Sequence, residues 1–163
     1  VARAIRTRLP MAVLMLEPDL LGEDTGGARQ DGESLLCSMV ELVQNRIRSQ
    51  DIVGRYGACE LLLVLPDTSA QGAARLAEQL CDAARDLPPL PGGTPALTLS
   101  VGVFGGRLEP GDSWDQLIHA ADHALEQARQ YGGNRVHTTA TLGRMAHAGM
   151  MTSSHATFPT SLH

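Results

Sequence analysis

The spacing of apolar residues predicts alternating strands and helices in the first half of the chain. Met11–Leu16 is a continuous apolar run, which is typical of a buried strand. Apolar residues then recur at helical spacing along one face of Ser34–Ile47, which predicts a helix. Two short apolar runs, Asp51–Arg55 and Leu61–Leu65, flank a turn that contains Gly57, and this pattern predicts a β-hairpin.

The alternation continues beyond the hairpin. The further predicted elements are a helix with its apolar stripe over Ala70–Ala84, a strand over Ala96–Val103, a helix over Trp114–Ala128 and a short strand over Arg135–Thr138. Ser69 and its two predecessors form an N-cap region for the first of these helices, and Asp112 or Ser113 caps the second. Loops are expected at Gly22–Gly32 and Leu87–Pro95. We therefore expect an α/β (α+β) sandwich of the ferredoxin-like kind, with a mixed, mainly antiparallel sheet, flanking helices and a protruding β-hairpin.

Length and composition fit one globular domain. The chain has 163 residues and 43% hydrophobic residues, but only 3% aromatic residues, so aliphatic side chains must build the core. A net charge of −5 argues against a general nucleic-acid binder. We expect the domain to cover residues 1–138, and we expect residues 139–163, which lack periodicity, to form a disordered tail.

Cysteine usage and hydropathy indicate the setting. The three cysteines are odd in number and far apart, which favours a reduced, cytoplasmic environment. No run approaches the ~20 apolar residues of a membrane span. Because the chain does not begin with Met, we expect it to be a fragment, which could be the cytoplasmic part of a larger, membrane-associated protein.

The hairpin carries a signature. Residues 55–61 read Arg-Tyr-Gly-Ala-Cys-Glu-Leu, and three further segments follow in order: Leu65-Pro66 with Thr68, the strand Thr98–Val103, and the helix and turn from Ala121 to Arg135. Together these segments resemble the GGDEF domain, the diguanylate cyclase family, over about residues 11–138. Ala2–Leu9 resembles a remnant of the family's first helix. The resemblance implies the family's nucleotidyl-cyclase-like fold.

The family condenses two GTP molecules into cyclic di-GMP with divalent metal, and the resemblance places its metal and phosphate positions here. One metal carboxylate falls at Glu17 and the other at Cys59, whose thiol is a poor ligand for Mg²⁺. Glu60 matches the family's acidic residue, and Arg129 stands at its phosphate-binding Lys. Gly133 replaces the partner Arg of that pair.

Two more features of that site differ from the family. Ala58 adds a methyl group where phosphates approach bare backbone, and Leu61 replaces Phe. The guanine-reading positions align with Thr25 and Glu33, and a Thr lacks the paired donor and acceptor of an amide. We therefore interpret the site as vestigial, with no catalytic residue and no cofactor. A divergent active cyclase using Glu17 and Glu60 with Mg²⁺ is the alternative.

A second motif lies just before the hairpin. Arg48 and Asp51 have the spacing of the family's RxxD inhibitory site, which binds cyclic di-GMP. An Arg fork suits the guanine O6/N7 edge or phosphate, and a carboxylate can accept from guanine N1 and N2. The other interpretation is an ion pair that closes the turn. Further contacts are expected from Arg55, Arg75, Arg85 or Gln79, of which Gln79 aligns with the family's extra Arg.

Other chemistry is weaker. His119 and His123 have metal-binding spacing but no evident third ligand, so exposed helix histidines are favoured. We interpret Cys59 as a small buried residue and Trp114 as a core anchor.

The function hypotheses are three: a bacterial cyclic di-GMP receptor acting in biofilm or exopolysaccharide regulation, the divergent cyclase, and a dimerisation or docking domain that binds no nucleotide. Expected partners are cyclic di-GMP, flanking domains or a regulated protein, and a second copy, but not nucleic acid.

Overall fold

The computed structural model describes residues 1–19, 28–88, 97–140 and 142. Among these residues, no helix is both long enough and apolar enough to cross a bilayer. Most of the predicted tail, residue 141 and residues 143–163, lies outside the described residues.

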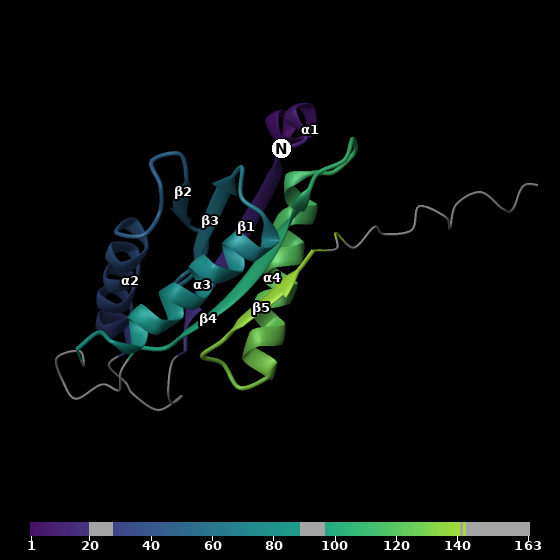
Figure 1. Cartoon of the computed structure of the whole chain (residues 1–163). Helices are drawn as coiled ribbons and strands as arrows, with labels where there is room; N and C mark the ends of the chain where they lie inside the picture. Colours follow the sequence, from purple (N-terminus) through teal and green to yellow (C-terminus); the bar gives the residue numbers. More distant parts are fainter. Residues whose placement is uncertain (20–27, 89–96, 141, 143–163) are drawn as a thin grey trace, which may run out of the picture.

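A five-stranded mixed sheet forms the centre of the fold (Figure 1). Its strands are β1 (Pro10–Pro18), β2 (Ile52–Arg55), β3 (Leu61–Pro66), β4 (Leu99–Arg107) and β5 (Val136–Thr139), in the order β2-β3-β1-β4-β5. β1 runs antiparallel to both β3 and β4, β2 runs antiparallel to β3, and β5 runs parallel to β4. The predicted sandwich and hairpin are confirmed.

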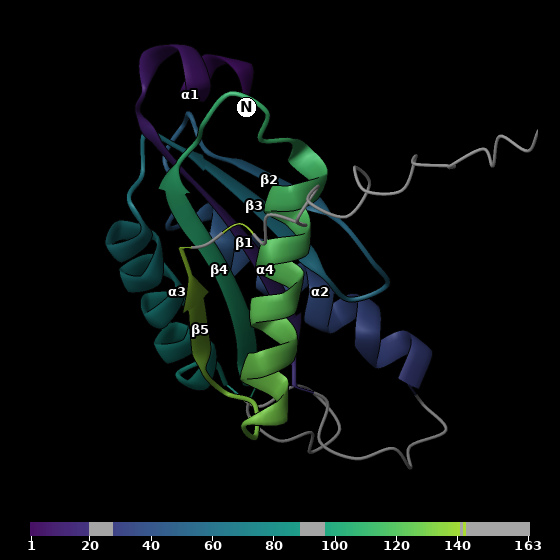
Figure 2. The same cartoon turned by 90° about the vertical axis from the view of Figure 1, so that its right-hand side faces the viewer.

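Helices cover both faces of the sheet (Figures 1 and 2). α2 (Ala28–Gln44) and α3 (Ala70–Arg85) pack on one face, where alternate residues of β1, β3 and β4 join the larger hydrophobic cluster. α4 (Trp114–Gln130) packs on the other face, where α1 (Ala2–Thr7) contributes partly buried residues. Because β1 is covered on both faces, its residues are apolar without alternation, as the sequence predicted.

Local signals explain where two helices begin. Ser69 caps α3 by accepting a hydrogen bond from the Gly72 N–H at 3.2 Å. Ser113 and Gln116 form a reciprocal capping box at the start of α4, which settles the choice between Asp112 and Ser113. Gly102 of β4 has no side chain, and a Cβ there would collide with the α4 backbone at Ala121 and Leu125. α4 can therefore lie directly on the sheet.

Three sequence predictions are corrected. α2 begins at Ala28, so the last part of the expected loop is helical. β4 begins at Leu99 and continues to Arg107, because it pairs with β1 along its whole length. Trp114, expected in the core, is 42% exposed at the first position of α4.

Candidate functional site

The carboxyl end of β1 gathers the residues that the sequence assigned to catalysis. Leu16 pairs with Leu61 on β3 and Glu17 pairs with Ser100 on β4, so the hairpin turn lies beside Glu17. From the α4 side, Arg129 Nη1 lies 3.1 Å from Glu17 Oε2. The expected juxtaposition of Glu17 with Arg129 is therefore present, and the two side chains pair with each other.

The electrostatics at Glu17 are set by opposing effects. Burial raises the pKa of Glu17 above its ordinary value, and the positive charge of Arg129 opposes that rise. The carboxylates of Glu60, Asp19 and Glu126 raise the pKa further. Oε2 of Glu17 is buried and has no aligned hydrogen-bond donor among the described residues, so its contact with Arg129 is an ion pair. Glu17 is thus a carboxylate held in an acidic neighbourhood by one guanidinium group.

Arg55 secures the hairpin turn. Its Nε donates to the Gly57 carbonyl at 3.0 Å, and its second guanidinium nitrogen donates to the Ala58 carbonyl at 2.7 Å. The Glu60 carboxylate occupies the space where a Cβ on Gly57 would lie. Arg55, a further contact expected for the Arg48–Asp51 motif, instead secures the hairpin turn at the end of β2 remote from Asp51.

The donor set in this turn does not fit Mg²⁺. Cys59, which the sequence interpretation expected to be buried, is half-buried and carries a thiol where a hard cation needs carboxylate oxygen. In the part of the chain that the structure describes, no group of three His, Cys, Asp or Glu side chains is arranged to hold a metal ion. His119 and His123 therefore have no third ligand among the described residues. Glu17 is engaged by Arg129.

Asp19 organises this end of the sheet, and the sequence interpretation assigned it no role. Its Oδ1 accepts from Ser100 Oγ at 2.5 Å, and its Oδ2 accepts from Thr98 Oγ1 at 2.9 Å and the Asn134 N–H at 2.8 Å. Gly133, at φ +68°, leaves room for Asp19, because a Cβ there would press on its carboxylate. Asp19 thereby ties β1 to the start of β4 and to the turn after α4. The hydroxyls of Thr98 and Ser100, two residues apart at the start of β4, were the available signal.

The two positions that align with the family's guanine-reading residues are not described by the structure. Thr25 and the side chain of Glu33 lie outside the described residues.

The turn with Arg48 and Asp51 is closed by Asp51. Its Oδ2 accepts from the Arg48 backbone N–H at 2.8 Å, while the Asp51 N–H donates to the Arg48 carbonyl at 3.0 Å. The guanidinium group of Arg48 is exposed and has no hydrogen bond or ion pair among the described residues. The other interpretation of this motif, an Arg48–Asp51 ion pair, is not found among the described residues; Asp51 bonds instead to the Arg48 backbone. Oδ1 of Asp51 is buried and without a described donor.

The other candidates for this turn lie on α3. Arg75 and Gln79 are exposed there, and no hydrogen bond between described residues joins either of them to Arg48. Arg85 is engaged by Asp82 and by Asn134 Oδ1, the latter at 2.8 Å. Arg75 and Gln79 therefore remain candidate ligand contacts, whereas the Arg85 side chain is already engaged.

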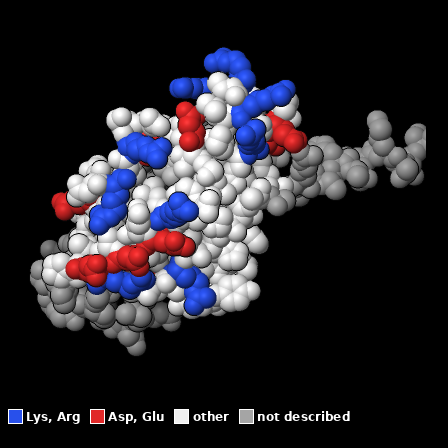
Figure 3. Space-filling model, in the orientation of Figure 1, with Lys and Arg blue, Asp and Glu red and all other residues white. Residues whose placement is uncertain are grey.

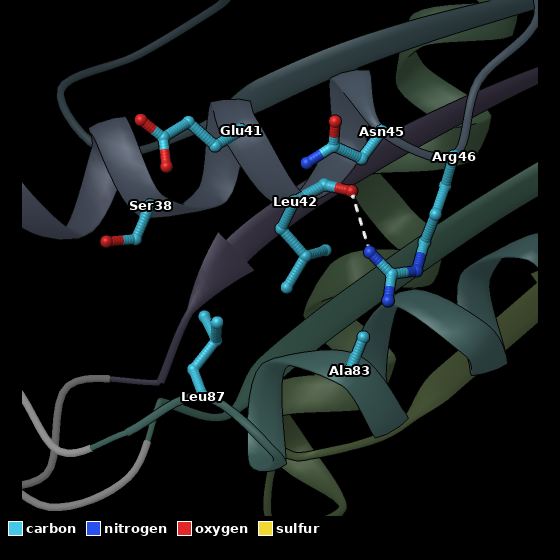
Figure 4. Close-up of a pocket in the computed structure, with 7 residues that line it drawn as sticks. All are labelled: Ser38, Glu41, Leu42, Asn45, Arg46, Ala83 and Leu87. Carbon is cyan, nitrogen blue, oxygen red and sulfur yellow. Dashed lines mark hydrogen bonds between the residues drawn. The ribbon is translucent and has the colours of Figure 1, made fainter.

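A small cavity between α2 and α3 was not predicted (Figure 4). It has a volume of about 170 Å³, and both polar and apolar side chains line it. The lining residues are Ser38, Glu41, Leu42, Asn45, Arg46, Ala83 and Leu87. Arg46 is partly engaged, since its Nη1 donates to the Leu42 carbonyl at 3.2 Å.

Acidic and basic side chains interleave on the face drawn in Figure 3. An acidic band crosses this face over the C-terminal half of α3, next to basic side chains. The face therefore offers no continuous basic surface of the kind that binds nucleic acid.

Comparison with known proteins decides the family. The protein-family model described as "Diguanylate cyclase, GGDEF domain" matches residues 2–135 of this chain. The chain belongs to the GGDEF family. Diguanylate cyclase DosC of Escherichia coli (strain K12) is 34% identical over 142 residues, which cover 83% of this chain and 30% of DosC. This GGDEF chain thus spans less than a third of the length of that relative.

Solved structures agree with the family. The active GGEEF domain of a diguanylate cyclase from Vibrio cholerae superposes with a TM-score of 0.73 and 27% identity, over 86% of this chain and 89% of that domain. Diguanylate cyclase SiaD from Pseudomonas aeruginosa, solved in complex with its activator SiaC, gives a TM-score of 0.74 and 30% identity, over 85% of this chain and 53% of SiaD. The fold of this GGDEF domain is therefore that of its relatives.

Proposed function

We propose that this GGDEF domain is a cyclic di-GMP receptor module without cyclase activity, and that it takes its ligand at Arg48 and Asp51. The observation that carries the proposal is the exposed, unengaged guanidinium group of Arg48 on a turn that Asp51 already holds closed. A preformed turn spends little conformational entropy when a ligand arrives.

The chemistry of the turn suits a guanine base. Arg48 would donate two parallel hydrogen bonds to the O6/N7 edge or to a phosphate, and a bidentate contact of this kind is worth ~1–3 kcal/mol. Oδ1 of Asp51 lacks a described donor, and the guanine N1–H and N2–H groups would supply one. Because this oxygen is buried, binding requires a local movement that exposes it to the base. Arg75 and Gln79 are the candidates for the outer contacts.

The argument against synthesis rests on the donor set at the hairpin. Phosphoryl transfer from GTP needs divalent metal, and a thiol at Cys59 disfavours a hard cation. Glu17 and Arg129 bind each other, so GTP and metal would have to break that ion pair. Gly133 provides no second basic side chain for phosphate.

Calorimetric titration tests the receptor. Cyclic di-GMP should bind the wild-type chain, and Arg48→Ala should weaken binding by about 10- to 100-fold, the equivalent of one lost bidentate contact. Arg107→Ala is the matched control, because Arg107 is also an exposed arginine and has no side-chain hydrogen bond among the described residues. Absence of heat with the wild type refutes the proposal, and so does equal weakening by both variants.

An active cyclase is the second candidate. One observation favours it: Glu60 and Arg129 lie close enough to Glu17 for their charges to shift its pKa. Incubation with GTP and Mg²⁺, followed by chromatography, distinguishes the two. The receptor proposal expects no cyclic di-GMP from the wild type. Formation of product by the wild type, and its loss in Glu60→Gln, would establish the cyclase instead.

A receptor domain must communicate ligand binding to other protein segments through contacts outside the ligand turn. SiaD has been solved with an activator protein, and we propose that this domain likewise works with flanking domains or a regulated partner. We further propose a cytoplasmic location, in bacterial cyclic di-GMP signalling such as biofilm control.

A further inference from the structure

The outer edge of β2 is open. β2 is an edge strand, and β3 is its only neighbour in the described sheet. The Tyr56 N–H donates to the Glu60 carbonyl at 2.9 Å, which fixes the phase of the antiparallel ladder. Backbone groups alternate in such a ladder, so those of Val53 and Arg55 point away from β3. Neither residue has a backbone partner on that side among the described residues.

The side chains of this strand leave the edge unprotected. Ile52 and Tyr56 are 60% and 53% exposed and lie on the same face, separated by Gly54. Natural edge strands are usually blocked by lysine, proline, a bulge or a covering element. The one charged side chain of β2, Arg55, is bonded to the carbonyls of Gly57 and Ala58. An exposed apolar edge with free backbone groups is a surface for strand addition.

We propose that β2 pairs with β2 of a second copy of this chain, antiparallel, about a two-fold axis through Gly54. In this register Val53 of one copy exchanges both backbone hydrogen bonds with Arg55 of the other, and the two-fold axis repeats that exchange. Ile52 then lies directly opposite Tyr56 of the second copy, on one face. The two five-stranded sheets become one continuous sheet across the dimer.

The pattern of the strand fits its own reverse. Ile52 and Tyr56 stand two residues on either side of Gly54, so an antiparallel copy matches an aliphatic with an aromatic side chain twice. Gly54 leaves open space on the axis, since nothing lies within 4 Å of a Cβ built there. A parallel arrangement would instead place Asp51 beside Asp51 and Arg55 beside Arg55, which repel. Self-complementarity therefore selects a second copy in the antiparallel direction.

The dimer is a weak one. A four-residue edge buries less surface than the ~1,200 Å² typical of stable complexes. We expect sedimentation velocity to show a monomer at ~10 µM chain and increasing dimer toward ~1 mM, without nucleotide.

Introducing a charge at Gly54 tests the proposed two-fold axis. Gly54→Glu and Gly54→Lys each place two like charges opposite each other across the two-fold axis, and each should weaken self-association at least about tenfold. The open space at Gly54 lets either side chain fit the monomer. An equimolar mixture of the two variants should associate again, because Glu then faces Lys. Gln71→Glu, an exposed change on α3, is the control and should associate like the wild type.

The outcomes are decisive. Circular dichroism first checks that both variants keep the wild-type fold. A wild type that stays monomeric at every concentration overturns the proposal. So does a Gly54→Glu variant that dimerises like the wild type, or a mixture that remains monomeric. Because no nucleotide is present, these results are independent of cyclic di-GMP binding.

Discussion

Asp19 should carry a large share of the stability at the site end of the sheet. Its carboxylate accepts three hydrogen bonds, of which the one from Ser100 joins it to a fully buried residue and the one from Thr98 is part-buried. Asp19→Ala leaves both hydroxyls without an acceptor, and each unsatisfied buried group costs ~1–3 kcal/mol. Water replaces the bond to the exposed Asn134 amide. We expect Asp19→Ala to lower the free energy of unfolding by about 3 kcal/mol, and Asp19→Asn by about 1 kcal/mol.

Urea unfolding followed by circular dichroism measures this difference. Asp122→Ala is the matched control, because Asp122 is exposed on α4 and should change stability by less than ~0.5 kcal/mol. Adding Ser100→Ala to Asp19→Ala should cost less than Ser100→Ala costs in the wild type, since the hydroxyl has then lost its acceptor. A loss below ~1 kcal/mol for Asp19→Ala, or fully additive effects, would refute the reasoning.

Three further predictions concern packing, charge and thiol chemistry. Gly102→Ala should destabilise the domain by about 3 kcal/mol or more in urea titrations, because its Cβ meets the α4 backbone, whereas Gly106→Ala in the same strand has ordinary contacts and should be mild. Burial raises the pKa of Glu17, so the wild type should lose stability relative to Glu17→Gln as pH rises from 4.5. Urea unfolding at a series of pH values measures this difference, and a flat or reversed trend would contradict the prediction. Burial raises the pKa of the Cys81 thiol to about 11, so a thiol reagent followed by mass spectrometry should label exposed Cys37 rapidly and Cys81 only after unfolding; rapid labelling of native Cys81 would contradict its burial.

The elements that local signals determine were predictable from sequence. The apolar run of β1, the hairpin around Gly57 and the cap at Ser113 depend on neighbouring residues, and the structure has each of them. The extension of β4 to Arg107 depends on its pairing with β1, which no local window contains. α2 includes Gly32 and so extends into the segment from Gly22 to Gly32, whose Gly, Asp and Thr content predicted a loop.

In the candidate site, too, some features were predictable from the sequence and others were not. The resemblance brought Glu17, Arg129 and the hairpin to one place, and the structure joins Glu17 to Arg129 directly. The use of Arg55 as a brace for the turn, and of Asp51 as a cap for the Arg48 amide, depends on side-chain geometry that spacing cannot supply. Asp19 was missed because its partners lie on a distant strand and turn.

Amide chemical-shift mapping tests the central claim most directly, since it locates the ligand on the chain. On addition of cyclic di-GMP to the wild type, the account predicts the largest shifts at the turn from Arg48 to Ile52, and little change at the hairpin turn from Gly57 to Glu60 or at Arg129. Shifts centred on the hairpin and Arg129, or no shifts at saturating ligand, would contradict it.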